Sequence, residues 1–162
     1  MNPIDHDCQV ALSSYMTWIL KSFQKYSRET TEFLSEHGRF WRCGTFADCL
    51  KGTERLCFSN SLAMAKRLEG ELIYCEGYAT AVQDQWPEHH AWCVTMDAEV
   101  VDFTWPDYGT AYFGIAFDPV FIRDWSDTDE NLGILRPQNL QKLPPVGWKW
   151  EAKPSGDCTG AN

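Results

Sequence analysis

The sequence has no apolar run of about 18 residues, the length that a membrane-spanning helix needs, so we predict no transmembrane segment. It also lacks a cluster of basic residues, since Lys66 and Arg67 form only an isolated pair. With a formal net charge of −9, the chain is a poor match for nucleic acid or an anionic membrane. Residues 1–7 have neither a basic nor an apolar stretch, so we expect no signal peptide.

Paired Cys-x-x-Cys spacings are absent too, although the chain has seven cysteines. An odd number of dispersed cysteines without an export signal predicts reduced thiols and a cytoplasmic protein. A zinc site at His37, Cys43, Cys49 and Cys57 is the alternative, but these residues lack the short paired spacing of structural zinc sites. We therefore expect no metal and no cofactor.

The length of 162 residues fits one domain, large enough to bury a core without disulfide or metal. We assign residues 1–143 to a single catalytic-type domain, with a core at 50–117 and N-terminal helices within 7–37. Residues 144–162 are rich in proline and glycine without any period, so we expect a loosely attached tail.

Hydrophobic periodicity predicts helices followed by a run of antiparallel strands, the pattern of an α+β domain. The expected helices cover residues 7–26, 30–37, 56–69 and 118–125. The expected strands cover residues 72–81, 89–96, 99–104, 111–117 and 132–135. Residues 38–56 show no clear period, and we interpret them as a loop packed on the core.

Cys57 lies near the start of a predicted helix, and His90 begins a predicted strand. A thiol is a weak nucleophile until it loses its proton, and both a helix N-terminus and a nearby imidazole favour the thiolate. His90 shares its strand face with Trp92 and Val94, so its imidazole should point toward an apolar layer.

Asp102 lies on the next strand, and the turn between the strands decides whether it meets His90. A two-residue turn would put the two side chains on opposite faces. A three-residue loop at residues 96–98 would pair Thr95 with Glu99, making His90 and Asp102 diagonal neighbours on one face. A Cys-His-Asp triad therefore predicts the three-residue loop.

In that triad, Cys57 attacks a carbonyl carbon, His90 transfers the proton, and Asp102 orients the imidazole. The developing oxyanion needs hydrogen-bond donors, and the backbone N–H of Cys57 is one candidate. The second donor stays open between Trp41, Gln24 and Asn60, and Trp92 and Trp105 are candidates for the walls of the cleft.

At these positions the sequence resembles the transglutaminase-like branch of the papain-like cysteine enzymes. The resemblance covers residues 50–117 and rests on four stretches in the family's order: Cys57-Phe58-Ser59-Asn60, Gly77-Tyr78-Ala79, His90-Ala91-Trp92 and Asp102-Phe103-Thr104-Trp105. It implies a nucleophile helix packed on a small antiparallel sheet, with Cys57 as nucleophile, His90 as base and Asp102 as orienting acid. Phe103 departs from the family, which often has proline there.

The resemblance implies attack on an amide of a protein or peptide-like substrate through a thioester acyl-enzyme. We expect water as the acceptor, as in a protease or deamidase. The alternatives are a transglutaminase or acyltransferase with an amine acceptor, and a binding or inhibitor protein that keeps the fold without chemistry. The sequence leaves the oligomeric state open.

The remaining polar and thiol side chains have simpler interpretations. We expect Cys75 and Cys93 to be packing residues in strands, and His89 to face away from His90, toward solvent. Glu76 and Asp84 are most simply interpreted as solvated carboxylates.

Overall fold

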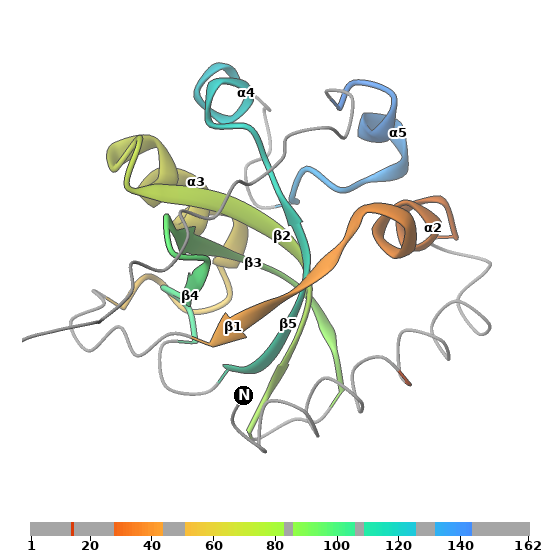
Figure 1. Cartoon of the computed structure of the whole chain (residues 1–162), viewed down its shortest axis with the longest axis horizontal. Helices are drawn as coiled ribbons and strands as arrows, with labels where there is room; N and C mark the ends of the chain where they lie inside the picture. Colours follow the sequence, from red (N-terminus) through yellow and green to blue (C-terminus); the bar gives the residue numbers. More distant parts are fainter. Residues whose placement is uncertain are drawn as a thin grey trace, which may run out of the picture.

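The computed structural model describes residues 14, 28–43, 51–82, 86–105, 109–125 and 132–143. The predicted helix at 7–26, apart from Ser14, lies outside these residues, as do Asp84 and the tail at 144–162. The described part is a mixed helix-and-strand structure whose sheet curls around its own interior (Figure 1). This agrees with the predicted α+β class.

Five strands form the sheet, in the order β1-β4-β3-β2-β5, and β5 pairs with β1 so that the sheet is closed. All neighbouring strands are antiparallel except β1 and β4, which are parallel. The strands are β1 (Arg39–Cys43), β2 (Leu72–Ala81), β3 (Glu88–Thr95), β4 (Glu99–Val101) and β5 (Gly109–Ala116).

The inner face of the closed sheet holds one apolar cluster to which every strand contributes. Its buried members are Trp41, Ile73, Cys75, Ala79, Trp92, Val94, Val100 and Tyr112. Because side chains alternate along a strand, the other face of β2 and β3 carries Tyr74, Ala91 and Cys93, which belong to a second cluster under the helices. Both faces are therefore buried, as expected for the nearly continuous apolar sequence of β2.

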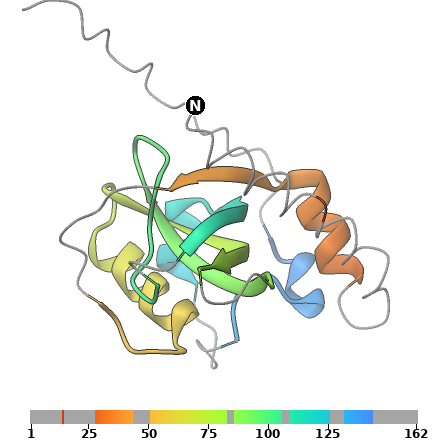
Figure 2. The same cartoon turned by 90° about the horizontal axis from the view of Figure 1, so that it is seen from below.

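In the described part of the chain, four helices cover the outside: α2 (Arg28–His37), α3 (Cys57–Arg67), α4 (Pro119–Asp124) and α5 (Pro137–Leu140). α3 packs on β2 and β3 and lies beside α4, whereas α2 packs on β5 and lies beside α5 (Figures 1 and 2). The Ser61 hydroxyl donates to the Ala91 carbonyl at 3.0 Å, and the Cys93 thiol donates to the Ser61 carbonyl at 3.3 Å, which fixes α3 on β3.

The predicted helices at 30–37, 56–69 and 118–125 are present as α2, α3 and α4. α3 ends before Gly70, which has a φ of 88°, and α4 begins after Asp118, whose carboxylate accepts from the N–H groups of Val120 and Phe121. Strand β2 has the predicted bounds, and β3, β4 and β5 lie within a few residues of theirs.

Two predictions of secondary structure are wrong. Residues 39–43 form strand β1 rather than a loop, because they pair with β4 and β5, which lie far along the chain. Residues 132–135 do not form a strand, because Gly133 has a φ of 74° and the next two N–H groups bind a side chain instead of a neighbouring strand.

The hairpin between β3 and β4 has the register that the triad requires. Val94 pairs with Val100 and Cys93 with Val101, so three residues, 96–98, form the loop. The Ala98 N–H donates to the Thr95 carbonyl at 2.9 Å, and Ala98 has a φ of 62°, which is typical of a three-residue hairpin loop. Continuing this register past β4 brings Asp102 beside Trp92, on the face that carries His90.

Candidate active site

Cys57 is the first residue of α3, and its side chain is buried with 8% of its surface exposed. Leu56 precedes it at the N-cap position without a side-chain cap, so no side chain satisfies the first N–H groups of the helix from that position. The chain enters through a turn in which the Leu56 N–H donates to the Thr53 carbonyl and Arg55 has a φ of 65°. This turn directs the nucleophile candidate toward the sheet.

His90 is the third residue of β3 and is 2% exposed. Its Nε2 atom lies 2.7 Å from Asp102 Oδ2, so the contact predicted from the hairpin register is present. The indole of Trp105 stacks on the imidazole with 3.9 Å between ring centroids and 10° between planes. The ring is therefore fixed in both position and tilt.

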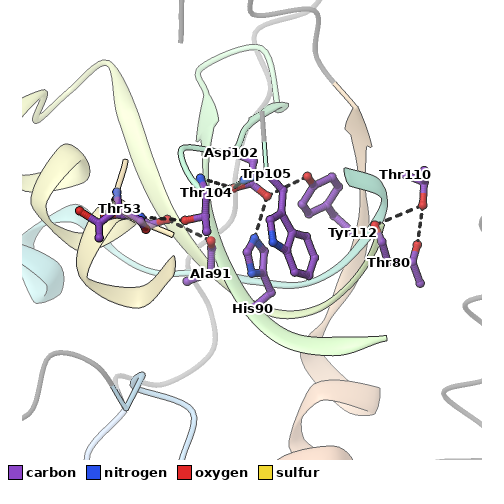
Figure 3. A network of polar contacts seen from close by, with 11 residues as sticks. Thr53, Thr80, His90, Ala91, Asp102, Thr104, Trp105, Thr110 and Tyr112 are labelled. Atoms are coloured by element: carbon purple, nitrogen blue, oxygen red, sulfur yellow. Dashed lines mark hydrogen bonds and ion pairs between the residues drawn. The ribbon is translucent and has the colours of Figure 1, made fainter. Parts of the chain in front are cut away.

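Among the described residues, four groups donate hydrogen bonds to Asp102, two to each carboxylate oxygen (Figure 3). The backbone N–H groups of Thr104 and Trp105 donate to Oδ1 at 2.8 and 2.9 Å. His90 and the Tyr112 hydroxyl donate to Oδ2 at 2.7 and 2.9 Å. Such a carboxylate has its lone pairs satisfied despite being 5% exposed, so it can stay ionised in an apolar interior.

The charges of this group are coupled. Burial by itself lowers the pKa of His90, but hydrogen bonds with Asp102 and Cys57 and their charges outweigh burial and raise the pKa from 6.5 to about 9. For Asp102, burial raises the pKa, whereas the hydrogen bond and charge of His90 and the two backbone N–H groups hold the pKa below its ordinary value. Near pH 7 the pair is therefore an imidazolium and a carboxylate.

The contact with Asp102 uses one of the two ring nitrogens of His90. Because Nε2 carries the bond to Asp102, Nδ1 is the nitrogen left for the thiol. The structure thus brings together the three predicted residues in the order thiol, imidazole and carboxylate.

Asn60 connects the segment before Cys57 to the segment after Asp102. Its Nδ2 atom donates to the Thr53 carbonyl at 2.7 Å and to the Thr104 hydroxyl at 2.9 Å. The Gly52 N–H donates to the Phe103 carbonyl at 2.6 Å, which adds a second connection between the same segments. Asn60 was a candidate oxyanion donor, but both of its amide hydrogens are engaged, so it instead links the segment before Cys57 to the segment after Asp102.

The other oxyanion and cleft candidates differ in what their donors bind. The Trp41 indole N–H donates to the Gly114 carbonyl at 3.1 Å, which removes Trp41 as a free donor. The Trp92 indole nitrogen is fully buried and has no hydrogen-bond partner among the described residues. Trp105 covers His90, as a cleft wall would, and Gln24 lies outside the described residues.

Tyr112 is a site residue that the sequence analysis missed. An aromatic residue in a predicted strand is most simply a core residue, and nothing local in the sequence indicates that its hydroxyl meets Asp102. The sequence offered one signal, the alternation of side chains along the strand: it puts Tyr112 on the same face of β5 as Gly114, and β5 lies two strands from β3, which carries His90.

The assignment of Glu76 as a solvated carboxylate is wrong, because Glu76 is fully buried on the outer face of β2. It accepts from the Tyr74 hydroxyl at 2.8 Å and from the N–H groups of Ile134 and Leu135 at 2.7 and 2.8 Å. His89 Nε2 lies 2.9 Å from Glu76 Oε1, so the imidazole is directed at a buried acid, and 32% of the His89 side chain is exposed. His89 does point away from His90, but toward Glu76.

The described residues contain no group of three His, Cys, Asp or Glu side chains arranged to hold a metal ion. Cys49 and the side chain of Cys43 lie outside this description. Within the described residues, Cys57, Cys75 and Cys93 form no disulfide, and burial raises the pKa of Cys75 well above its usual range.

Comparisons of the chain with protein-family models, with curated proteins and with solved structures give no match. Among the helices of the described residues, none has both the length and the apolar character needed to cross a membrane.

Proposed function

We propose that the chain is a cysteine-dependent amide hydrolase of the transglutaminase-like, papain-like type, acting in the cytoplasm on a protein or peptide-like substrate. The observation that carries the proposal is the buried His90, whose Nε2 atom lies 2.7 Å from Asp102 Oδ2 and whose pKa is raised to about 9 by its interactions with Asp102 and Cys57. An imidazolium beside Cys57 at neutral pH favours the thiolate, which is the reactive form of cysteine.

The reaction divides into two proton transfers through His90. The Cys57 sulfur attacks the amide carbonyl and forms a tetrahedral intermediate, and the His90 Nδ1 proton passes to the leaving amine as the carbon–nitrogen bond breaks. Water then gives a proton to Nδ1 and attacks the thioester, which releases the carboxylic acid and restores the thiol pair. Asp102 keeps its negative charge throughout and stabilises the imidazolium.

The N-terminus of α3 is suited to the oxyanion. The N–H of Cys57 belongs to the first turn, where N–H groups have no partner within the helix, and the helix dipole favours negative charge there. Trp92 offers a second buried donor on the same strand face as His90.

The proposal is tested by the rate of iodoacetamide labelling at each cysteine from pH 5 to pH 9, read by peptide mass spectrometry. Below about pH 8.5, an ordinary thiol loses close to tenfold in rate per pH unit. We expect Cys57 to label faster than an ordinary thiol at pH 7, because the neighbouring imidazolium favours the thiolate, and His90→Gln to remove this difference. Cys75 and Cys93 in the same sample are matched controls, because both are fully buried and should stay unlabelled.

Labelling of Cys57 that follows the ordinary thiol profile, or that does not change in His90→Gln, contradicts the proposal. If labelling supports it, p-nitrophenyl acetate should give a burst of one nitrophenolate per chain that is lost in Cys57→Ala. Adding a primary amine at millimolar concentration then separates the two acceptors, because a transferase would form the amide whereas a hydrolase would release acetate.

A further inference from the structure

We propose that Tyr112 is a positioning residue of this site, a fourth member of the polar chain that moderates how tightly His90 holds its proton. The inference rests on the proposed function, because it assigns Tyr112 a part in proton transfer to the leaving group. It goes beyond the triad, in which Asp102 alone governs the imidazole.

The contact between Tyr112 and Asp102 is direct and buried (Figure 3). The phenol donates to Asp102 Oδ2 at 2.9 Å, and this is the oxygen that His90 binds at 2.7 Å. An ionised carboxylate can only accept, so the hydroxyl must be the donor. Tyr112 is 3% exposed, so water does not replace this bond readily.

The backbone around Tyr112 makes room for its hydroxyl. A Cβ atom at Gly109 would overlap the Tyr112 hydroxyl, so only glycine fits there without displacing the phenol. The pairing of β2 with β5 shifts register at Thr80 and Ala81, and the hydroxyls of Thr80 and Thr110 hydrogen-bond at 2.8 Å across this irregularity. Such bulges commonly direct a side chain beside a functional site.

Gly109 also connects this end of β5 to Trp105, whose indole stacks on the His90 imidazole. The Gly109 N–H donates to the Trp105 carbonyl at 3.3 Å. The contacts of Trp105 with Gly109 and His90, and those of Asp102 with Tyr112 and His90, thus hold the phenol, the indole and the carboxylate in place around the imidazole.

Sharing one oxygen between two donors has a predictable electrostatic effect. The Tyr112 hydroxyl draws negative charge from Oδ2, so less charge is available to stabilise the His90 imidazolium. Among the described residues, titratable groups reach His90 from three elements: the thiol of Cys57 on α3, the carboxylate of Asp102 after β4, and the phenol of Tyr112 on β5 through that carboxylate. Among them only Tyr112 is a neutral donor to Asp102, so it opposes the effect of the carboxylate.

The test is an NMR titration of the His90 ring in Tyr112→Phe, with Tyr78→Phe as the matched control. Tyr78 lies on β2 next to β5 but on the other face of the sheet, packed against the outer cluster. Removing the Tyr112 hydroxyl should raise the His90 titration midpoint by about half to one pH unit. Tyr78→Phe should leave the midpoint unchanged.

A kinetic measurement connects the titration to the reaction. A proton held more tightly is transferred more slowly, so we expect Cys57 acylation by a p-nitroanilide substrate to slow by about threefold to tenfold in Tyr112→Phe. Incorporating 3-fluorotyrosine at position 112 gives a stronger donor of nearly the same shape, and it should lower the His90 midpoint. If Tyr112 acted through packing alone, the shift of the His90 titration midpoint would not have opposite signs in these two variants.

A midpoint that stays unchanged or falls in Tyr112→Phe overturns the inference, and so does an upward shift with 3-fluorotyrosine. If Tyr112→Phe fails to fold, the 3-fluorotyrosine protein decides the question alone. The proposed function fails separately, by ordinary reactivity of Cys57 in the unmodified protein, and the titration of His90 can be read in either case.

Discussion

His90 contributes to folding as well as to the proposed chemistry, because its two neighbours stabilise the charged imidazole only in the folded state. The pKa of an unfolded histidine is near 6.5, whereas that of folded His90 is about 9. A raised pKa means that the stabilising contribution is complete below pH 6.5 and is lost as the pH rises through 9.

We therefore predict that the free energy of unfolding falls between about pH 6.5 and pH 9, by about 3 kcal/mol in total from this residue. The measurement is urea unfolding at a series of pH values for the unmodified protein and for His90→Gln. The difference between the two proteins should decline with pH across that window. A difference that stays constant with pH would show that His90 is not charged in the folded protein.

The residues of the site differ in how far the sequence could identify them. Cys57, His90 and Asp102 were predictable, because a helix start, a strand face and one hairpin register bring them together. Glu76 was not, since a lone carboxylate in a strand is usually solvated, and its donors lie about 58 residues further along the chain at Ile134 and Leu135. The burial of Glu76 is explained only by hydrogen-bond donors that lie far from it in the sequence.

At the scale of elements, the hairpin of β3 and β4 sets the register on which the site depends. Its loop contains Ala98 at a φ of 62°, a conformation in which a Cβ atom is strained and glycine is not. The loop keeps its length because the Thr95 carbonyl and hydroxyl bind N–H groups at Ala98, Asp97 and Glu99.

We predict that Ala98→Gly stabilises the protein by about 0.5–1 kcal/mol, because relief of strain exceeds the added entropy of the unfolded chain. Ala63→Gly is the matched control: Ala63 is exposed in the middle of α3, where the same substitution should cost about 1 kcal/mol. Chemical denaturation measures both. Destabilisation of similar size in the two variants would argue that Ala98 is not strained.

The elements that the sequence failed to predict are those defined by distant partners. Strand β1 has only five residues, with arginine near both ends, so its sequence has no clear alternation. Its structure depends on Phe113 and Gly114 of β5, which lie more than 70 residues away. Strand β2 was predicted with its observed bounds, because ten residues of largely apolar sequence end at a glycine-containing turn on one side.

At the scale of the whole molecule, Glu76 joins the far end of the described chain to the sheet. Its carboxylate binds Ile134 and Leu135, and the Thr30 hydroxyl of α2 donates to the Leu135 carbonyl at 3.5 Å. A Cβ atom at Gly133 would lie 2.7 Å from the ring of Phe58, the residue that follows Cys57. Segment 132–136 therefore supports the first turn of α3 as well as the sheet.

We predict that Glu76→Gln destabilises the protein by about 2–4 kcal/mol, because the amide replaces an acceptor with a donor that faces backbone N–H groups. Glu71→Gln, at an exposed position before β2, is the control and should change stability by less than about 0.5 kcal/mol. Limited proteolysis should also begin to cut within residues 132–143 in Glu76→Gln. Unchanged unfolding and proteolysis would contradict the role of Glu76 as the anchor of this segment.

The closure of the sheet also has a consequence for synthesis on the ribosome. Strand β1 leaves the exit tunnel before the other strands, yet both its partners, β4 and β5, follow much later; Trp41 and Gly114 alone are 73 residues apart. At about 5–20 residues per second, the aromatic strand waits several seconds without its native neighbours. During that interval its backbone N–H and C=O groups lack the partners they have in the sheet, and the sheet closes only after Cys57, His90, Asp102 and Tyr112 have all been made.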